Sequence, residues 1–261
     1  RFIHSLGTFH LAQTVLLSLI DREQLEGVGS EDSLRQSFQI AALLHDCAHS
    51  PFSHTGEEFT KSLHKDSNEA SLVQLADDPD FADDFKNALN TPATHEVASA
   101  LLVLRLFKKP IIEHYGGNPL LIARMITGCK YRNPDGPQEK VENCLIELVN
   151  GPTIDVVKLD YILRDTWASG VKNASVDIDR LISSLEFIGG QDGSLRVALS
   201  KRALSVIQNM VQARDFLYQW IVCHHKVVYE KHLLETAIKD LGEALREKAA
   251  LETADDALRP L

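Results

Sequence analysis

The densest group of chemically active residues in the chain lies just after an apolar run. His45 and Asp46 follow Ala41-Ala42-Leu43-Leu44, and His49 and His54 come shortly afterwards. Neutral imidazole and carboxylate together suit borderline divalent metals such as Mn, Fe, Zn or Ni better than a structural thiolate site would. The segment therefore predicts a metal centre with nitrogen and oxygen ligands.

A helix explains how this doublet could be buried. Leu34, Phe38, Ala41 and His45 follow one another at the i, i+4, i+7, i+11 spacing of a single helical face. An ionisable group that continues an apolar stripe needs a partner in the core. Taken alone, the doublet leaves a second interpretation open, in which His45 is a hydrogen-bonded core histidine beside a helix-ending Asp46.

Two further motifs favour the functional interpretation. The chain opens with Arg1-Phe2-Ile3-His4-Ser5-Leu6-Gly7, and a later segment reads Asp155-Val156-Val157-Lys158-Leu159-Asp160-Tyr161. With the His-Asp segment between them, these motifs resemble the HD-domain superfamily, and within it the branch of dGTP and dNTP triphosphohydrolases. The resemblance extends from residue 1 to about residue 230. It implies a mainly helical HD-domain fold and metal-dependent hydrolysis of dNTPs to deoxynucleoside and triphosphate.

The resemblance also implies the metal ligands. His4, His45 and Asp46 match three of the four residues that hold the family's divalent metal, which here could be Mn, Fe, Zn, Ni or Mg. The fourth is an aspartate immediately before the lysine of the third motif, where this chain has Val157. An isopropyl group cannot bind a cation.

Two nearby carboxylates are candidates to replace the missing ligand. On a helix, Asp155 lies about 200° from Val157 and would face away, whereas Asp160 lies about 60° away and one turn along. Three interpretations remain open: a weakened three-ligand site, completion of the shell by Asp160 or water, and a chain that has lost activity.

Further histidines surround the expected metal. By resemblance, His49, His54 and His95 match active-site histidines, with Glu57 and Glu96 as nearby carboxylates. Phosphoester cleavage needs an acid for the leaving oxygen, and a histidine held by a carboxylate can supply it. We expect His54 to donate that proton, Glu57 to orient it, and His49 and His95 to contact phosphate oxygens. For His95 the alternative is the simple start of a helix.

Substrate recognition is expected from the helix of the third motif. Lys158, Tyr161 and Asp165 lie at i, i+3 and i+7, so they share one face, and Arg164 lies beside them. Lys158 would contact phosphate, Tyr161 the sugar, and Asp165 the 3′-hydroxyl. The resemblance implies that the tyrosine excludes a 2′-hydroxyl, so the substrate would be a deoxynucleotide.

Residues from both ends of the resemblance complete this expected site. Arg1 matches a family arginine that packs on the base. His225 and Lys226, downstream of Arg214, resemble a later segment in which the family has a tyrosine where this chain has Cys223. The selectivity for base or sugar could therefore differ from that of the family.

Composition restricts the class of protein. At 261 residues, with 44% hydrophobic and 25% charged residues, the chain suits one globular domain, expected as an HD core over 1–170 and a helical and hairpin extension over 171–261. A net charge of −10 argues against nucleic acid as a partner. We find no CxxC pair among the four cysteines and no apolar run of membrane-spanning length, so we expect a cytoplasmic protein with reduced thiols. The opening motif without Met suggests a fragment of a longer chain.

Periodicity predicts an all-α fold with one small β-hairpin near residues 186–199. The expected helices are 5–22, 32–47, 54–63, 94–108, 118–128, 138–150, 155–166, 176–187, 201–221 and 225–250. The acidic stretch 77–84 is expected as a solvated loop or a helix start, and 239–251 as a surface helix.

Two other functions stay open at this stage. One is a different HD enzyme, such as a nucleotide phosphatase or a cyclic-nucleotide phosphodiesterase. The other is a catalytically weak dNTP-binding regulatory protein, for which Val157 is the reason. In each case the resemblance also leads us to expect a homo-oligomer.

Overall fold

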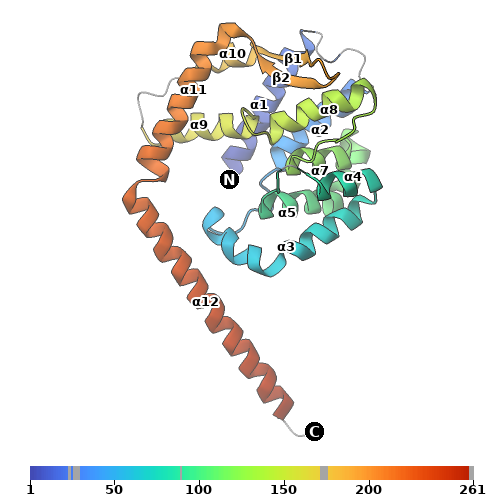
Figure 1. Ribbon diagram of the computed structural model, residues 1–261. Coiled ribbons are helices and arrows are strands. Elements are labelled where there is room, and N and C mark those ends of the chain that lie inside the picture. Colours follow the sequence, from blue (N-terminus) through green and yellow to red (C-terminus); the bar gives the residue numbers. More distant parts are fainter. Residues whose placement is uncertain (23–24, 26–29, 89, 171–175, 259–261) are drawn as a thin grey trace.

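The computed structural model describes residues 1–22, 25, 30–88, 90–170 and 176–258, and within these the side chains outside 58–66 and 246–258. Helices dominate this part of the chain, as the sequence predicts (Figure 1). The body contains α1 (Phe2–Ile20), α2 (Glu31–Leu44), α3 (His54–Ala76), α4 (Pro79–Lys86), α5 (Thr94–Leu102), α7 (Pro119–Thr127), α8 (Gly136–Val149) and α9 (Val156–Ala168). It continues into α10 (Ile178–Ile182), α11 (Leu204–Leu217) and α12 (His225–Leu258).

The core forms where the amphipathic faces of these helices meet. α1 packs against α2 and α9, and α7 packs against α2, α5 and α8. Leu16, Phe38, Ile122 and Leu145 are fully buried there. Because α1, α2, α5 and α9 all contact this core, the residues at their ends have fixed positions relative to one another.

Helix α1 also meets a length and hydropathy criterion for crossing a membrane, by composition only. In the structure its apolar face belongs to the core, where Ala12, Val15, Leu16 and Leu19 are almost completely buried. The same face carries His4, which is 7% exposed.

The predicted hairpin is confirmed. Strands β1 (Leu185–Gly189) and β2 (Leu195–Leu199) pair antiparallel, with Leu185 opposite Leu199. They lie at one end of the molecule near α10 (Figure 1). The predicted helix over 176–187 is therefore shorter, because the chain is already extended at Leu185.

The prediction of a solvated acidic stretch is wrong for Asp84. Asp78 caps α4 by accepting a hydrogen bond from the Phe81 amide at 2.6 Å, which agrees with a helix start. Asp84 is buried, and one of its carboxylate oxygens lies 2.8 Å from Nη1 of the fully buried Arg124. The guanidinium of Arg124 also lies 4.0 Å from the ring centre of Tyr131. The ion pair joins residues 40 positions apart, so helical periodicity gives no sign of it.

Two helices run further than expected. The helix that begins as α5 continues through two π-helical turns, Val103–Phe107 and Ile111–Tyr115, with α6 (Lys108–Pro110) between them. Helix α12 contacts α3 and extends away from the body (Figure 1). Most of its described side chains are exposed, as expected for a surface helix.

All four cysteines are free thiols.

Candidate active site

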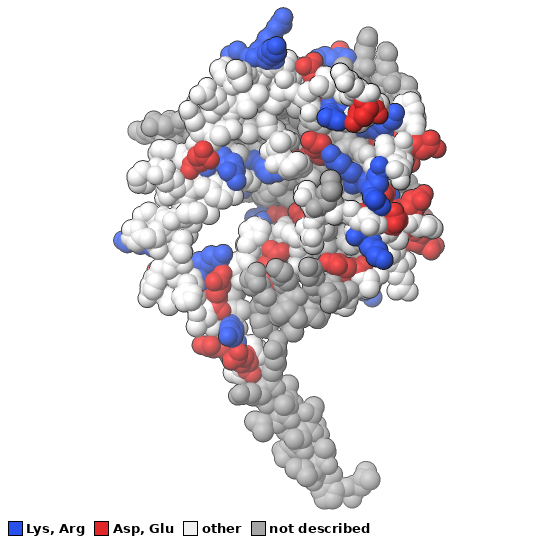
Figure 2. Space-filling model, viewed as in Figure 1, with Lys and Arg blue, Asp and Glu red and all other residues white. Residues whose placement is uncertain are grey.

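A cavity of about 710 Å³ opens between the ends of α1, α2 and α5 on one side and α9 and α11 on the other. Figure 2 shows an opening in the molecular surface at this cavity, with positively and negatively charged side chains around it. Most of the predicted site residues line this cavity: Arg1, His4, His45, Asp46, His54, His95, Lys158, Tyr161, Arg164 and Asp165.

The three predicted metal ligands converge in one buried cluster. His4 comes from the first turn of α1, His45 ends α2, and Asp46 follows in the turn. Nε2 of His4 lies 3.2 Å from Nε2 of His45, and the Asp46 carboxylate oxygens lie 3.9 Å and 3.5 Å from these two nitrogens. Helix packing therefore brings together ligand atoms that are 41 residues apart in the sequence.

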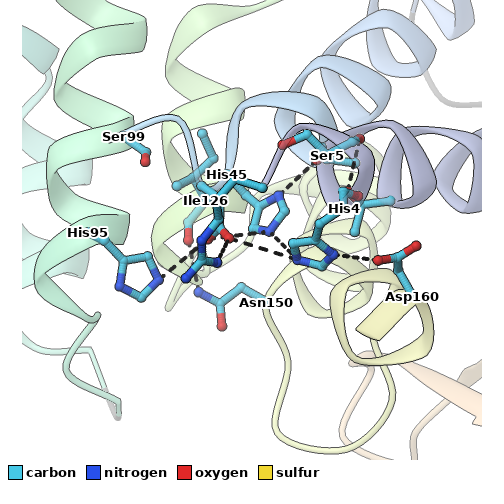
Figure 3. Close-up of polar contacts among 12 residues, drawn as sticks. His4, Ser5, His45, His95, Ser99, Ile126, Asn150 and Asp160 are labelled. Carbon is cyan, nitrogen blue, oxygen red and sulfur yellow. Dashed lines mark hydrogen bonds and ion pairs between the residues drawn. The ribbon is translucent and has the colours of Figure 1, made fainter. Parts of the chain in front are cut away.

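Hydrogen bonds fix which ring nitrogen of each histidine faces the cluster. Nδ1 of His45 lies 2.8 Å from the Ala42 carbonyl oxygen, and Nδ1 of His4 lies 2.5 Å from Oδ2 of Asp160. A carbonyl or carboxylate oxygen can only accept, so each Nδ1 donates its proton. In the neutral imidazoles that bind metals, both Nε2 lone pairs then point at the same place (Figure 3). Two facing lone pairs suit a shared cation, so this donor set fits a divalent metal.

The charge states agree with that assignment. Burial is the main cause that lowers the pKa of His45, so its imidazole is neutral near pH 7. Burial acts to raise the pKa of Asp46, but the nearby His45 and Arg1 outweigh it, and the carboxyl pKa lies below its usual value. A neutral imidazole beside an ionised carboxylate is the form in which these residues bind metals.

Arg1 is placed beside Asp46, one of the three predicted metal ligands. Its guanidinium forms an ion pair with Oδ2 of Asp46. A base-packing role for Arg1 would require this guanidinium to leave the carboxylate when a metal and nucleotide bind.

The structure places Asp160 on the far side of His4 from the metal cluster. Figure 3 shows His45 on one side of the His4 ring and Asp160 on the other. Among the described residues, the cluster of converging ligand atoms contains His4, His45 and Asp46 and does not include Asp160. Val157 lines the cavity, as the resemblance implies. Asp160 therefore orients His4 instead of replacing the missing ligand.

Asp155 is the N-cap residue of α9. Its carboxylate accepts hydrogen bonds from the Lys158 amide at 2.7 Å and from the Gly151 amide at 3.3 Å. Its Oδ2 also lies 2.5 Å from Nζ of Lys158, which donates to the Gly151 carbonyl as well. Lys158 thus lines the cavity with its ammonium held at the helix start, so contact with phosphate would require it to be released.

Gly7 belongs to the opening motif, but the sequence alone assigns it no role. The structure places it directly against Asp160. A Cβ atom built on Gly7 would lie 1.8 Å from Oδ1 of Asp160, far inside any real contact. Only glycine therefore lets α1 approach α9 closely enough for Asp160 to reach His4.

A second cluster contains His49, His54, Glu57 and His95. The Glu57 carboxylate bridges two of the histidines, with Oε2 3.1 Å from Nδ1 of His54 and Oε1 2.9 Å from Nδ1 of His95. Burial acts to raise the pKa of Glu57, but hydrogen bonds from His95 and His54 outweigh it and lower the pKa to about 2. An ionised Glu57 thus orients both imidazoles, and Nε2 of His95 lies 3.7 Å from Asp46.

The His49 ring is held by contacts with two other histidine rings. Its centre lies 4.2 Å from that of the His95 ring in a nearly parallel stack and 4.7 Å from that of the His54 ring in an edge-to-face arrangement. Among the described residues, neither of its buried nitrogens has a hydrogen-bond partner. Burial, followed by the neighbouring His95, lowers its pKa to about 4. His49 is therefore neutral near pH 7, with two unpaired nitrogens beside the metal cluster.

The turn before His54 is strained. Phe52 and Ser53 have φ angles of 64° and 61°, and Ser53 combines its angle with a ψ of −141°, a region that only glycine adopts readily. This turn places His54 at the start of α3, where its side chain is 68% exposed towards the cavity.

Of the remaining predicted residues, one lines the cavity and two lie outside its lining. Glu96 lines the cavity and accepts a hydrogen bond from the Ala93 amide at 2.7 Å, so it caps α5. His225 and Lys226 begin α12 with exposed side chains and do not belong to the cavity lining. The lining also contains residues that sequence reasoning missed, namely Asn150, Leu217, Tyr218 and Val222.

Comparison with known proteins agrees with this geometry. The HD domain family matches residues 1–115, the segment that supplies His4, both clusters and the strained turn. The match thus covers the part of the chain in which these histidines and carboxylates lie.

Similarity extends beyond this segment. The human deoxynucleoside triphosphate triphosphohydrolase SAMHD1 is 26% identical over 92% of this chain and 36% of its own length. The uncharacterized protein MG461 of Mycoplasma genitalium is 26% identical over 85% of this chain and 44% of its own length. The uncharacterized protein YwfO of Bacillus subtilis is 24% identical over 97% of this chain and 47% of its own length. The chain thus spans less than half the length of these relatives.

Proposed function

We propose that this chain is a metal-dependent HD phosphohydrolase that converts a dNTP into deoxynucleoside and inorganic triphosphate. The observation that carries the proposal is the direct contact between two clusters. Neutral His45 and ionised Asp46 form one, and His95, which is held by ionised Glu57, lies 3.7 Å from that aspartate. Metal ligands and proton-transfer groups thus share one end of the cavity.

A bound divalent metal would supply Lewis-acid stabilisation and an activated water. In the reaction, water adds to the α-phosphorus, the bond from phosphorus to the 5′-oxygen breaks, and that oxygen takes a proton. We assign the transfer of this proton to His54, because Glu57 holds its Nδ1 and Nε2 can then face the cavity. His49 and His95 would hold phosphate oxygens.

The other end of the cavity suits a nucleoside. Tyr161, Leu217, Tyr218 and Val222 line it, and a volume of about 710 Å³ is within the range of small-molecule sites. The name of the human relative, a deoxynucleoside triphosphate triphosphohydrolase, supports the choice of dNTPs. The net charge of −10 argues against nucleic acid as a partner in our proposal.

The test couples metal analysis to product identification. Purified protein is analysed for bound metal and incubated with each dNTP and with Mn²⁺, Fe²⁺, Zn²⁺, Ni²⁺ or Mg²⁺. We expect deoxynucleoside and triphosphate in equal amounts. His45→Ala and Asp46→Ala should lose both bound metal and turnover with little change in helical circular dichroism, whereas the exposed His10→Ala should match wild type. Release of single phosphates would favour a different HD phosphatase, and full activity of His45→Ala would refute the assignment.

Val157 supports a second candidate, a dNTP-binding regulatory protein with weak catalysis. The cavity wall carries an isopropyl group where the family has a metal-binding carboxylate. Equilibrium binding of dNTPs without turnover, across all five metals, would favour this candidate over the enzyme.

We also propose a homo-oligomer. Trp220, Val228, Tyr229 and Leu233 are apolar side chains about half exposed near the start of α12. Sedimentation at micromolar concentration, with and without dNTP, should show species larger than a monomer, and a strict monomer in both conditions would contradict this.

A further inference from the structure

Arg164 lines the cavity and contacts two carboxylates of its own helix, α9. Its Nε lies 3.1 Å from Oδ2 of Asp160, one helical turn earlier, and its Nη1 lies 2.6 Å from Oδ1 of Asp165, the next residue. Consecutive side chains on a helix point in directions about 100° apart, so they do not normally face each other. A side chain as long as arginine can nevertheless reach both carboxylates at once, and here it does.

The contact with Asp160 leads to the metal cluster. Oδ2 of Asp160 also accepts a hydrogen bond from Nδ1 of His4 at 2.5 Å, so one carboxylate oxygen serves both donors. Asp160 is 7% exposed, and Figure 3 shows it on the side of the His4 ring that faces away from His45. A buried carboxylate needs a positive partner, and Arg164 supplies one. Arg164 therefore fixes the group that turns Nε2 of His4 towards the cluster.

The contact with Asp165 leads to the expected nucleoside. Asp165 lines the same cavity, and its side chain is 42% exposed, so a ligand can reach it. A sugar hydroxyl can donate a hydrogen bond to a carboxylate. Because a guanidinium holds its donors in a rigid plane, the bonds from Arg164 keep Asp160 and Asp165 at a fixed spacing.

The local charge favours this linking role over direct binding of phosphate. Two carboxylates face the single guanidinium of Arg164, so the group carries an excess of negative charge. Such an excess repels a phosphate and attracts a divalent cation. Arg164 thus differs from a cation that is free to bind the triphosphate.

We propose that Arg164 is a positioning residue for both ends of the cavity. Through Asp160 it aims His4 at the metal, and through Asp165 it holds an acceptor in place for the sugar. The inference rests on the proposed function, in which a metal and a nucleoside share this cavity. Each carboxylate serves one end, so loss of one carboxylate should affect one ligand, whereas loss of Arg164 should affect both.

Two equilibrium measurements test this without turnover. Mn²⁺ binding is followed by the electron paramagnetic resonance signal of the free ion, and binding of each deoxynucleoside by NMR titration in EDTA. We expect Arg164→Gln to weaken Mn²⁺ binding about tenfold and deoxynucleoside binding about fivefold. Asp160→Asn should weaken Mn²⁺ binding alone, and Asp165→Asn deoxynucleoside binding alone. The exposed Arg105→Gln is the matched control and should change neither.

A double-mutant cycle separates positioning from a general loss of structure. If Arg164 acts on the metal through Asp160, the double variant Arg164→Gln/Asp160→Asn should bind Mn²⁺ as well as Asp160→Asn does. The double variant leaves no unpaired carboxylate at position 160, so it stays informative even where Arg164→Gln alone fails to fold. Arg164→Lys keeps the charge without the planar fork and should recover at most one of the two affinities.

The outcomes separate the inference from the function it rests on. Unchanged affinities or tighter Mn²⁺ binding in Arg164→Gln, additive losses in the cycle, or full recovery of both affinities by Arg164→Lys would each refute the positioning role while the proposed function stands. If both ligands respond as expected but no dNTP is hydrolysed, the positioning role stands and the proposed enzyme does not. A wild-type protein that binds neither Mn²⁺ nor a deoxynucleoside would contradict both.

Discussion

Gly7 and Asp160 are in such close contact that the space for a Cβ atom on Gly7 is already filled by the Asp160 carboxylate, whose Oδ1 would lie 1.8 Å away. The other oxygen of that carboxylate holds Nδ1 of His4 at 2.5 Å. One contact between α1 and α9 therefore links the opening motif of the chain to the last motif through His4, a predicted metal ligand.

We predict that Gly7→Ala weakens the metal site. In an exposed helix this change stabilises by about 1 kcal/mol, because alanine has the higher helix propensity. At Gly7 the methyl group must push Asp160 away from His4, so we expect a lower Tm and weaker Mn²⁺ binding by calorimetry. Gly189→Ala is the control, because nothing lies within 4 Å of the added Cβ. A Gly7→Ala protein with wild-type Tm and affinity would contradict the packing.

Asp160→Asn tests the orienting role without changing the size of the side chain. The amide lacks the charge that strengthens the bond to Nδ1 of His4 and to Nε of Arg164, which lies 3.1 Å from the same carboxylate. Loss of a carboxylate that holds a ligating histidine costs about 10–100-fold in metal affinity, and we expect a loss in that range. Asp165→Asn, which changes a carboxylate on the same helix outside the cluster, should leave metal affinity unchanged.

Ser53→Gly should relax the turn before His54. Serine at φ 61° and ψ −141° stores backbone strain of roughly 1–3 kcal/mol, and glycine adopts this region freely. We expect a higher Tm together with a lower kcat, because a flexible turn no longer holds His54 in place. Ser50→Gly, in the same turn, is the comparison variant. A lower Tm for Ser53→Gly would show that the hydroxyl matters more than the strain.

His49 should make the metal-free protein less stable in mild acid. Its pKa is lowered from 6.5 to about 4 by burial and by His95, so the folded state binds fewer protons than the unfolded state between these values. Stability must then fall as pH drops from about 6.5 towards 4. Urea unfolding in EDTA should show this slope, and His49→Gln should reduce it. An unchanged slope in His49→Gln would assign the effect to other groups.

The sequence predicts the helices and the hairpin well because their periodicity is local. The His-Asp doublet and the opening motif also supply three ligand candidates that the folded chain brings together. The prediction fails where a side chain's partner is distant in the sequence. Asp84 pairs with Arg124, and Asp160 binds His4 from 156 residues away, so neither role leaves a periodic pattern.

The sequence places His225 and Lys226 in the expected site by resemblance and not by helical spacing. In the structure the π-helical turn Tyr218–Val222 ends at Cys223, and α12 begins at His225. Tyr218 and Val222 line the cavity, whereas His225 and Lys226 lie outside its lining. A change of helix between these residues leaves no periodic signal in the sequence.

The last prediction concerns Val157. If the metal is held by His4, His45 and Asp46 alone, an aspartate at Val157 adds a fourth, anionic ligand from the cavity wall. Val157→Asp should then bind Mn²⁺ about tenfold or more tightly and gain turnover. Without metal the new carboxylate is half-buried and unpaired, so the variant should have a lower Tm than wild type in EDTA and a larger rise in Tm when Mn²⁺ is added. Val157→Asn has nearly the same shape without the charge and should show a much smaller rise. Equal metal content and turnover in wild type and Val157→Asp would mean that the three-ligand site is already complete, whereas metal bound only by the variant would make the natural chain a nucleotide-binding relative of the enzymes.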